Sequence, residues 1–209
     1  MKRMSVVAFT ILALVGASHN VAAQEVAGAG RVELNLIPVG GIWFTNGDRD
    51  VSPSFRNYAL GASVAVNVNR VIGLEGEFAP GIGFRQTVTF AGVGFRTKVP
   101  NTWAYNGNFV YNPGGSDTRF VPYATAGIGA MVLRPRSDFE NISGFTDSET
   151  FFTQNFGGGV KWFTASHWGL RGDYRFLIVD GKSNANTFFA GDNENRFANR
   201  VYGAFVITY

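Results

Sequence analysis

Strict alternation of side-chain type is the feature of this sequence that most limits its fold. Between Tyr58 and Val68, side chains at even-numbered positions are apolar, whereas those at odd-numbered positions are small or polar. Successive side chains of a β-strand point to opposite faces, so the pattern predicts a strand with one apolar face. No segment after residue 23 has the roughly 18 continuous apolar residues of a transmembrane helix, and no sustained helical period is present. We therefore expect an all-β fold.

The same alternation recurs along the chain and predicts eight strands. They cover residues 31–44, 58–68, 72–84, 103–111, 120–132, 151–163, 168–176 and 200–209. The fifth has small or apolar residues on both sides, so its faces stay unassigned. Short turns at 67–70, 112–119 and 164–167 alternate with longer loops at 45–57, 85–101, 134–148 and 179–196. This spacing predicts an eight-stranded antiparallel transmembrane β-barrel with both termini on the short-turn, periplasmic side.

The N-terminus has the anatomy of an export signal. Lys2 and Arg3 precede an apolar run over residues 4–17, and the small residues 21–23 follow. We expect a cleavable signal peptide at 1–23 and a barrel domain at 24–209. Cleavage removes two of the 18 Lys and Arg residues and none of the 15 Asp and Glu residues, so the mature chain is nearly neutral. It has no basic stripe for nucleic acid, and a chain without Cys excludes a disulfide scaffold.

Alternation alone also fits a soluble barrel with an apolar interior, so the contents of each face must decide the orientation. A face in contact with water would carry many long charged side chains. Here the polar face consists mostly of Gly, Ala, Ser and Asn, and only 16% of all residues are charged. Small side chains suit the narrow interior of an eight-stranded barrel. We therefore predict that the apolar face points toward lipid.

A few charged residues of both signs lie on the predicted inner face. They are Glu33, Glu75, Glu77, Lys161, Arg171, Asp173 and Arg175. Isolated buried charges are costly, so these groups must pair in a dry lumen. We interpret them as a salt-bridged plug across the barrel; a catalytic cluster or an ion-conducting constriction is the alternative.

Aromatic residues on the apolar face gather near the ends of the strands. Tyr111, Trp162, Trp168 and Tyr209 lie beside the short turns. Tyr58, Phe84, Trp103 and Phe176 lie beside the long loops. Amphipathic rings favour the headgroup region of a bilayer, so the two sets are typical of the two aromatic girdles of an outer-membrane barrel.

With these features, the chain resembles the OmpA-like/OmpX-like family of small outer-membrane β-barrels. The resemblance covers essentially the whole mature chain. Its motifs are FVPYATAGIGA at 120–130, NFGGGVKWF at 155–163, GLRGDYRF at 169–176 and the C-terminal residues 201–209. The sequence ends on the last predicted strand, so we expect no peptidoglycan-binding domain of the kind that OmpA carries. The resemblance also implies that Val201, Phe205, Ile207 and Tyr209 form the signal read by the barrel-assembly machinery, although Gly203 leaves one step of that pattern unfilled.

Three functions remain open. The first is a non-enzymatic surface protein with a structural, envelope or adhesion role, in which residues 86–99 form either a hairpin with an edge for strand addition or an ordinary loop. The second is a narrow pore for ions or solutes. The third, a lipid-A-modifying enzyme, is disfavoured because His167, the only His after residue 23, falls in a predicted periplasmic turn.

We expect a monomer without cofactor, metal or nucleic acid. The acidic stretch at 191–195 lacks the ligand spacing of an EF-hand loop. The expected partners are outer-membrane lipid, lipopolysaccharide and the barrel-assembly machinery, with a possible surface ligand at the loops.

Overall fold

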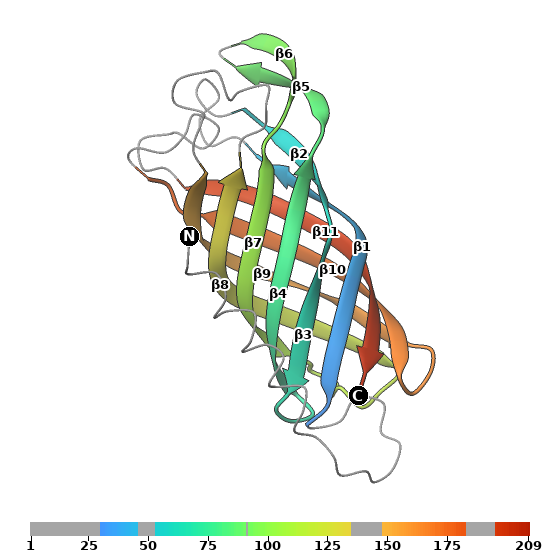
Figure 1. The fold of residues 1–209 in the computed structure, drawn as a ribbon. Coiled ribbons are helices and arrows are strands. Elements are labelled where there is room, and N and C mark those ends of the chain that lie inside the picture. Colours follow the sequence, from blue (N-terminus) through green and yellow to red (C-terminus); the bar gives the residue numbers. More distant parts are fainter. Residues whose placement is uncertain (1–29, 46–52, 91, 135–147, 183–194) are drawn as a thin grey trace, which may run out of the picture.

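In the computed structural model, the alternating segments pair into a tilted barrel with a small hairpin above one end (Figure 1). The structure describes residues 30–45, 53–90, 92–134, 148–182 and 195–209. The predicted signal peptide and most of the acidic stretch at 191–195 lie outside these residues. Among the residues described, no helix is long and apolar enough to cross a membrane.

The barrel wall is formed by nine strand segments. They are β1 (Val32–Phe44), β2 (Phe55–Ala59), β3 (Gly61–Asn67), β4 (Ile72–Gly83), β7 (Asn101–Tyr111), β8 (Phe120–Arg134), β9 (Glu149–Phe163), β10 (Trp168–Val179) and β11 (Arg196–Thr208). Segments β2 and β3 are two parts of one strand, because both pair with β1 and β4 and the Leu60 amide between them donates to the Pro80 carbonyl at 3.0 Å. All neighbours are antiparallel and β11 pairs with β1, so the predicted closed eight-stranded barrel is confirmed.

The apolar face points outward, as predicted. Leu74 on β4 is 55% exposed, whereas its neighbour Glu75 is only 3% exposed. The same alternation holds along β7, β10 and β11. On β8, whose faces the sequence leaves unassigned, the odd-numbered side chains from Val121 to Leu133 point inward. The barrel therefore presents its large apolar side chains to its surroundings and its polar side chains to its bore.

Strand β1 changes its facing pattern halfway along. Its odd-numbered residues up to Ile37 point inward, and after Val39 the inward side chains are the even-numbered Ile42 and Phe44. Pro38 and Val39 both point outward, and the register with β11 shifts at this position. This is the signature of a β-bulge, which a residue without a backbone N–H tolerates well. The first predicted strand therefore contains one extra residue that simple alternation does not reveal.

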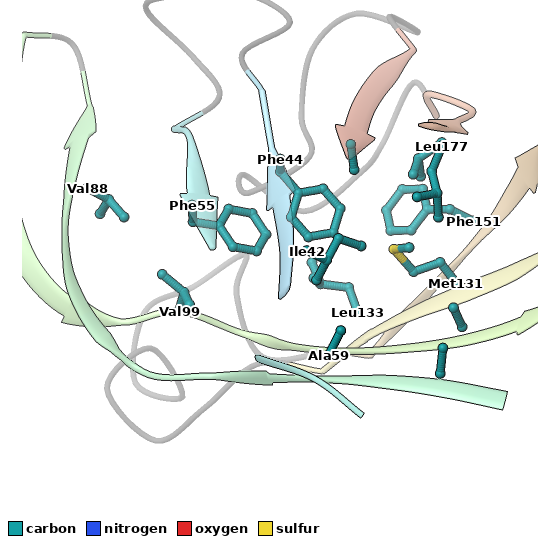
Figure 2. Packing of buried hydrophobic residues seen from close by; sticks show 14 residues of the cluster. Ile42, Phe44, Phe55, Ala59, Val88, Val99, Met131, Leu133, Phe151 and Leu177 are labelled. Carbon is teal, nitrogen blue, oxygen red and sulfur yellow. The ribbon is translucent and has the colours of Figure 1, made fainter. Parts of the chain in front are cut away.

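Three layers fill the bore. An apolar cluster including Phe44, Phe55, Met131, Phe151 and Leu177 lies where the strands meet the long loops, and Figure 2 shows these side chains together. Most of the charged groups lie in the middle layer. A smaller apolar cluster of Val121, Phe163 and Val206 lies near the short turns, at the level of the Lys161–Glu33 pair. The polar inner face expected from the sequence is therefore an incomplete description, because apolar side chains also fill the bore on both sides of the ion pairs of Glu75 and Glu77.

Candidate functional site

The middle layer of the bore holds a network of buried charged side chains. All seven residues predicted for the inner face point inward and are almost completely buried. They come from β1, β4, β9 and β10, which lie on different sides of the barrel. Close contact between them is therefore possible only because the eight-stranded bore is narrow enough for side chains to meet across it.

Glu75 is the carboxylate with the most partners. It accepts hydrogen bonds from Arg171, from Arg175 Nη2 at 2.6 Å and from Asn108 Nδ2 at 3.0 Å. The Ser63 hydroxyl donates to its second oxygen at 3.1 Å. These donors come from β3 and β7 on either side of β4 and from β10 across the bore, so one carboxylate connects opposite sides of the wall.

Asp173 is a second acceptor for the same two arginines. Arg171 Nη2 donates to Asp173 at 2.8 Å, and Arg175 Nε donates to it at 3.0 Å. The Tyr123 hydroxyl donates to Asp173 and accepts a hydrogen bond from Arg171 Nε at 2.7 Å. The guanidinium of Arg171 also lies 4.7 Å from the centre of the Tyr123 ring, a distance typical of a cation–π contact. Arg171 is thus held by an ion pair, a hydrogen bond and a ring contact, and Arg175 by an ion pair with the same carboxylate.

Two further ion pairs extend the network along the bore. Glu77 accepts from Arg200 Nη2 at 2.7 Å through both of its oxygens, and from Asn106 Nδ2 at 2.9 Å. Nearer the short turns, Lys161 Nζ lies 2.6 Å from Glu33. Asn67 Nδ2 donates to the other oxygen of Glu33 at 2.9 Å. The network therefore involves residues from every strand of the wall.

Sequence reasoning missed three important members of this network. Arg200 and Tyr202 occupy inward positions of the last strand. The charged residues predicted for the inner face do not include Arg200, and no role is predicted for Tyr202 from the sequence. Tyr123 was missed because the faces of β8 were ambiguous. With Arg200 included, four carboxylates face four cations, so the network is neutral as a whole. The expected need for charge balance in a dry bore was the signal that could have found Arg200.

The eight aromatic residues of the predicted girdles all point away from the bore. Tyr111, Trp162, Trp168 and Tyr209 lie at the ends of strands joined by short turns. At the long-loop end, Tyr58 and Phe84 meet edge to face with ring centres 6.4 Å apart, and Phe176 stacks on Phe197 at 5.6 Å. The Arg134 guanidinium covers Trp103, 3.8 Å from the ring centre.

The long segment between β4 and β7 forms a hairpin of β5 (Arg85–Phe90) and β6 (Val93–Lys98), a two-stranded sheet separate from the wall (Figure 1). The register places Arg85 opposite Lys98 and Thr87 opposite Arg96, so these three cations share one face. On the other face, Val88 is buried with the apolar cluster at the barrel mouth. Of the two forms considered for this segment, the structure has the hairpin.

The remaining sequence candidates do not join the network. His167 lies exposed in the turn before β10, where its carbonyl accepts from the Thr208 amide at 2.9 Å. In the part of the chain that the structure describes, no group of three or more His, Cys, Asp or Glu side chains is arranged to hold a metal ion.

Comparison with known proteins supports the architecture. A family model described as the outer membrane protein beta-barrel domain matches residues 9–200. No curated protein sequence matches the chain.

Solved structures with the same fold include the N-terminal barrel of Pseudomonas aeruginosa OprF, with 11% identity, a TM-score of 0.54 and coverage of 88% of this chain and 100% of that one. Neisserial surface protein A matches with 10% identity, a TM-score of 0.56 and coverage of 85% and 95%. Yersinia pestis Ail matches with 10% identity, a TM-score of 0.54 and coverage of 87% and 99%. At these identities the likeness concerns the fold alone.

Proposed function

Because this chain belongs to the outer membrane protein β-barrel domain family, we propose that it is a non-enzymatic surface protein whose filled barrel anchors the β5–β6 hairpin outside the cell. The observation that carries the proposal is the packing of the bore, in which paired charges lie between two apolar layers. A filled barrel of this size serves as a rigid support for whatever its loops present. The same packing argues against a narrow pore, the main alternative.

The proposed orientation places the long-loop end outside and the short turns and C-terminus in the periplasm. Outer-membrane barrels carry short periplasmic turns and longer outer loops, which is the distribution in this chain. The outward aromatic residues at both strand ends would lie at the two headgroup regions, in contact with lipid and, at the outer leaflet, with lipopolysaccharide. We further propose that the terminal strand β11 is the part that the barrel-assembly machinery recognises.

We propose that the hairpin gives the protein an adhesion role toward anionic polymers. Arg85, Arg96 and Lys98 gather on the face that points away from the apolar cluster. Clustered cations favour contact with polyanions in a salt-dependent way. Ail, one of the similar barrels, was solved in complex with the heparin analogue sucrose octasulfate. A sulfated polysaccharide is therefore a suitable first probe for this chain.

The test is the adhesion of bacteria that produce this chain to heparin-coated beads. The double variant Arg96→Glu, Lys98→Glu should lose adhesion, and raising the salt concentration should weaken adhesion of the unmodified chain. A matched control reverses two exposed cations at the opposite end, Arg70→Glu and Arg119→Glu, and should adhere normally. Heat-modifiable gel mobility checks that each barrel has folded. Equal adhesion by the hairpin variant and the control would refute this role.

A further inference from the structure

The barrel wall opens where β4 continues into the hairpin. Strands β2 and β4 are paired up to Asn57 and Gly83, and beyond that point β5 no longer follows β2. The side chain of Gln86 bridges the opening. Its Oε1 accepts from the Arg56 amide at 3.0 Å, and its Nε2 donates to the Arg56 carbonyl at 2.7 Å. One side-chain amide thus replaces the backbone of a neighbouring strand and links the two edges.

A cleft of about 760 Å³ lies at this opening, between the ends of β1 and β2 and the strand β5. Its lining residues are Trp43, Phe44, Thr45, Ser54, Phe55, Arg56, Gln86, Thr87 and Thr89. The cleft lies nearer the long loops than Tyr58, because Trp43 pairs with Arg56, which precedes Tyr58 by two residues on β2. It is large enough for one or two sugar rings and lies outside the charged middle layer of the bore.

The strand ends that line the cleft are packed from the inner side of the barrel wall, where Phe44 and Phe55 are each only 1% exposed. The rings of Phe44 and Phe55 stack with centres 4.5 Å apart, and Figure 2 shows them side by side within the apolar cluster. Behind them, the Arg196 guanidinium lies 5.3 Å from the Phe55 ring centre and donates a hydrogen bond to the Pro53 carbonyl. This packing on the inner side supports the strand ends whose outward side chains border the cleft.

The walls of the cleft are polar and accessible. Trp43 is 36% exposed, and the hydroxyls of Thr45, Ser54, Thr87 and Thr89 belong to exposed residues. Arg56 is also exposed and is the cross-strand neighbour of Trp43. An indole, several hydroxyls and a guanidinium therefore border one cleft on the outward side of these strand ends.

We infer that this cleft binds a sugar unit that carries an acidic group. The apolar side of a pyranose ring packs on the Trp43 indole, while its hydroxyls exchange hydrogen bonds with the Thr87 and Thr89 hydroxyls. The Thr45 hydroxyl, which donates to the Phe197 carbonyl at 3.2 Å, accepts from the sugar. Arg56 binds the phosphate, sulfate or carboxylate substituent. A peptide added as a strand fits less well, because Gln86 already satisfies the backbone of Arg56 on the β2 edge.

This inference is separate from the proposed adhesion role. Adhesion through Arg85, Arg96 and Lys98 depends on net charge and weakens steeply with salt. Binding in the cleft depends on Trp43, Arg56 and directed hydrogen bonds and is measured with soluble probes, which the hairpin variant Arg96→Glu, Lys98→Glu should bind as the unmodified chain does. Either property can fail while the other holds.

The test is ligand-observed NMR on the full mature barrel in detergent micelles free of lipopolysaccharide. The probes are glucosamine 6-phosphate, a glucuronic-acid-containing disaccharide, and maltose as a neutral sugar. Both acidic probes should bind, and Trp43→Ala or Arg56→Gln should each weaken binding about tenfold, the loss expected for about 1.4 kcal/mol. The control variants Trp162→Ala and Arg119→Gln carry the same changes at the opposite end and should bind normally.

The source of the sugar is distinguished by repeating the titration in bilayer nanodiscs with and without lipopolysaccharide. A resident glycolipid headgroup in the cleft would compete with the soluble probes only in the discs that contain lipopolysaccharide. A glycan from outside would leave the affinities equal in both discs. The inference is overturned if neither acidic probe binds in micelles, if Trp43→Ala leaves binding unchanged, or if an acidic extended peptide binds there and the sugars do not.

Discussion

Glu75 shows how a single residue can hold this barrel together. It receives both arginines of β10 in the middle of the bore, together with donors from β3 and β7. Removing one partner from a buried ion pair leaves an uncompensated charge, whereas an exposed ion pair contributes little. The cost of a substitution should therefore depend on its depth in the barrel more than on the residue type.

We predict that Glu75→Gln lowers the free energy of unfolding by on the order of 3 kcal/mol, because Arg171 and Arg175 then lose a shared counter-charge. The measurement is urea unfolding of the barrel reconstituted in lipid vesicles. Arg70→Gln is the matched control: it breaks the ion pair with Asp117, but the Arg70 side chain is 65% exposed, so it should cost less than about 1 kcal/mol. Similar losses for the two variants would argue against a buried network.

Two glycines on neighbouring strands offer a second test at the residue scale. Gly159 on β9 points into the bore, where a methyl group would overlap the Gly172 carbonyl and lie 2.7 Å from the Tyr123 hydroxyl. Gly172 on β10 points outward, and a methyl group there would meet nothing within 4 Å. Gly159 therefore relieves crowding inside the barrel.

Gly159→Ala should destabilise the barrel by about 1–3 kcal/mol, as overpacking usually does. Gly172→Ala should change stability little, because its methyl group faces the surroundings of the barrel. Thermal gel-shift midpoints of the two variants measured side by side will show the difference. Equal midpoints would mean that the space inside β9 is not limiting.

At the scale of elements, the hairpin depends on a few contacts at its base. An isolated two-stranded hairpin is only marginally stable, so β5 and β6 need support from the barrel. Val88 supplies apolar contact at the mouth, and the amide of Gln86 supplies both hydrogen bonds to Arg56. The hairpin is therefore expected to loosen before the barrel wall when the contacts at its base are weakened.

We predict that Gln86→Leu exposes the hairpin to proteolysis and leaves the barrel intact, because leucine cannot replace the two hydrogen bonds. Limited trypsin digestion of folded protein should cut faster after Arg96 and Lys98, while the heat-modifiable gel shift is retained. Thr97→Ala, a change of the residue opposite Gln86 on β6, serves as the control and should be cut at the original rate. An unchanged cutting rate in Gln86→Leu would place the support of the hairpin elsewhere.

Most strands, and which of their side chains point inward, could be predicted from the sequence. Along β3, β4, β7 and β10, one face of the strand is apolar and the other is small or polar. The pattern failed where that contrast is missing. On β8 both sides are small or apolar, so Tyr123 was not recognised as a partner of Asp173. At Pro38 and Val39 two apolar neighbours conceal the bulge, because a bulge adds a residue without changing composition.

The layers of the bore could not be predicted for a different reason. Alternation gives the facing of a residue, but its height in the barrel depends on strand tilt and on the register between strands. From the sequence, Phe44 is simply a strand residue and Leu177 falls just after a predicted strand, and only the register shows that they meet above the charges. The same limitation hid the partnership of Glu77 with Arg200.

For the whole molecule, the layered bore leads to a prediction about transport. Ions would have to pass two apolar layers and separate several buried ion pairs. Purified protein in planar bilayers should therefore show no steady conductance steps, and neither should Glu77→Gln. Steady steps whose size changes on neutralising Glu77 or Arg175 would favour the pore over the anchor.

The most direct measurement of the central claim is a spin-label scan along β4, from residue 72 to residue 78, in lipid bilayers. The chain has no cysteine, so each position can be labelled singly without background. Accessibility to oxygen, which dissolves in the hydrocarbon, should alternate with a period of two and be highest at Leu74, Gly76 and Phe78. Maxima at Gly73, Glu75 and Glu77, or no alternation at all, would contradict a barrel with its apolar face toward lipid.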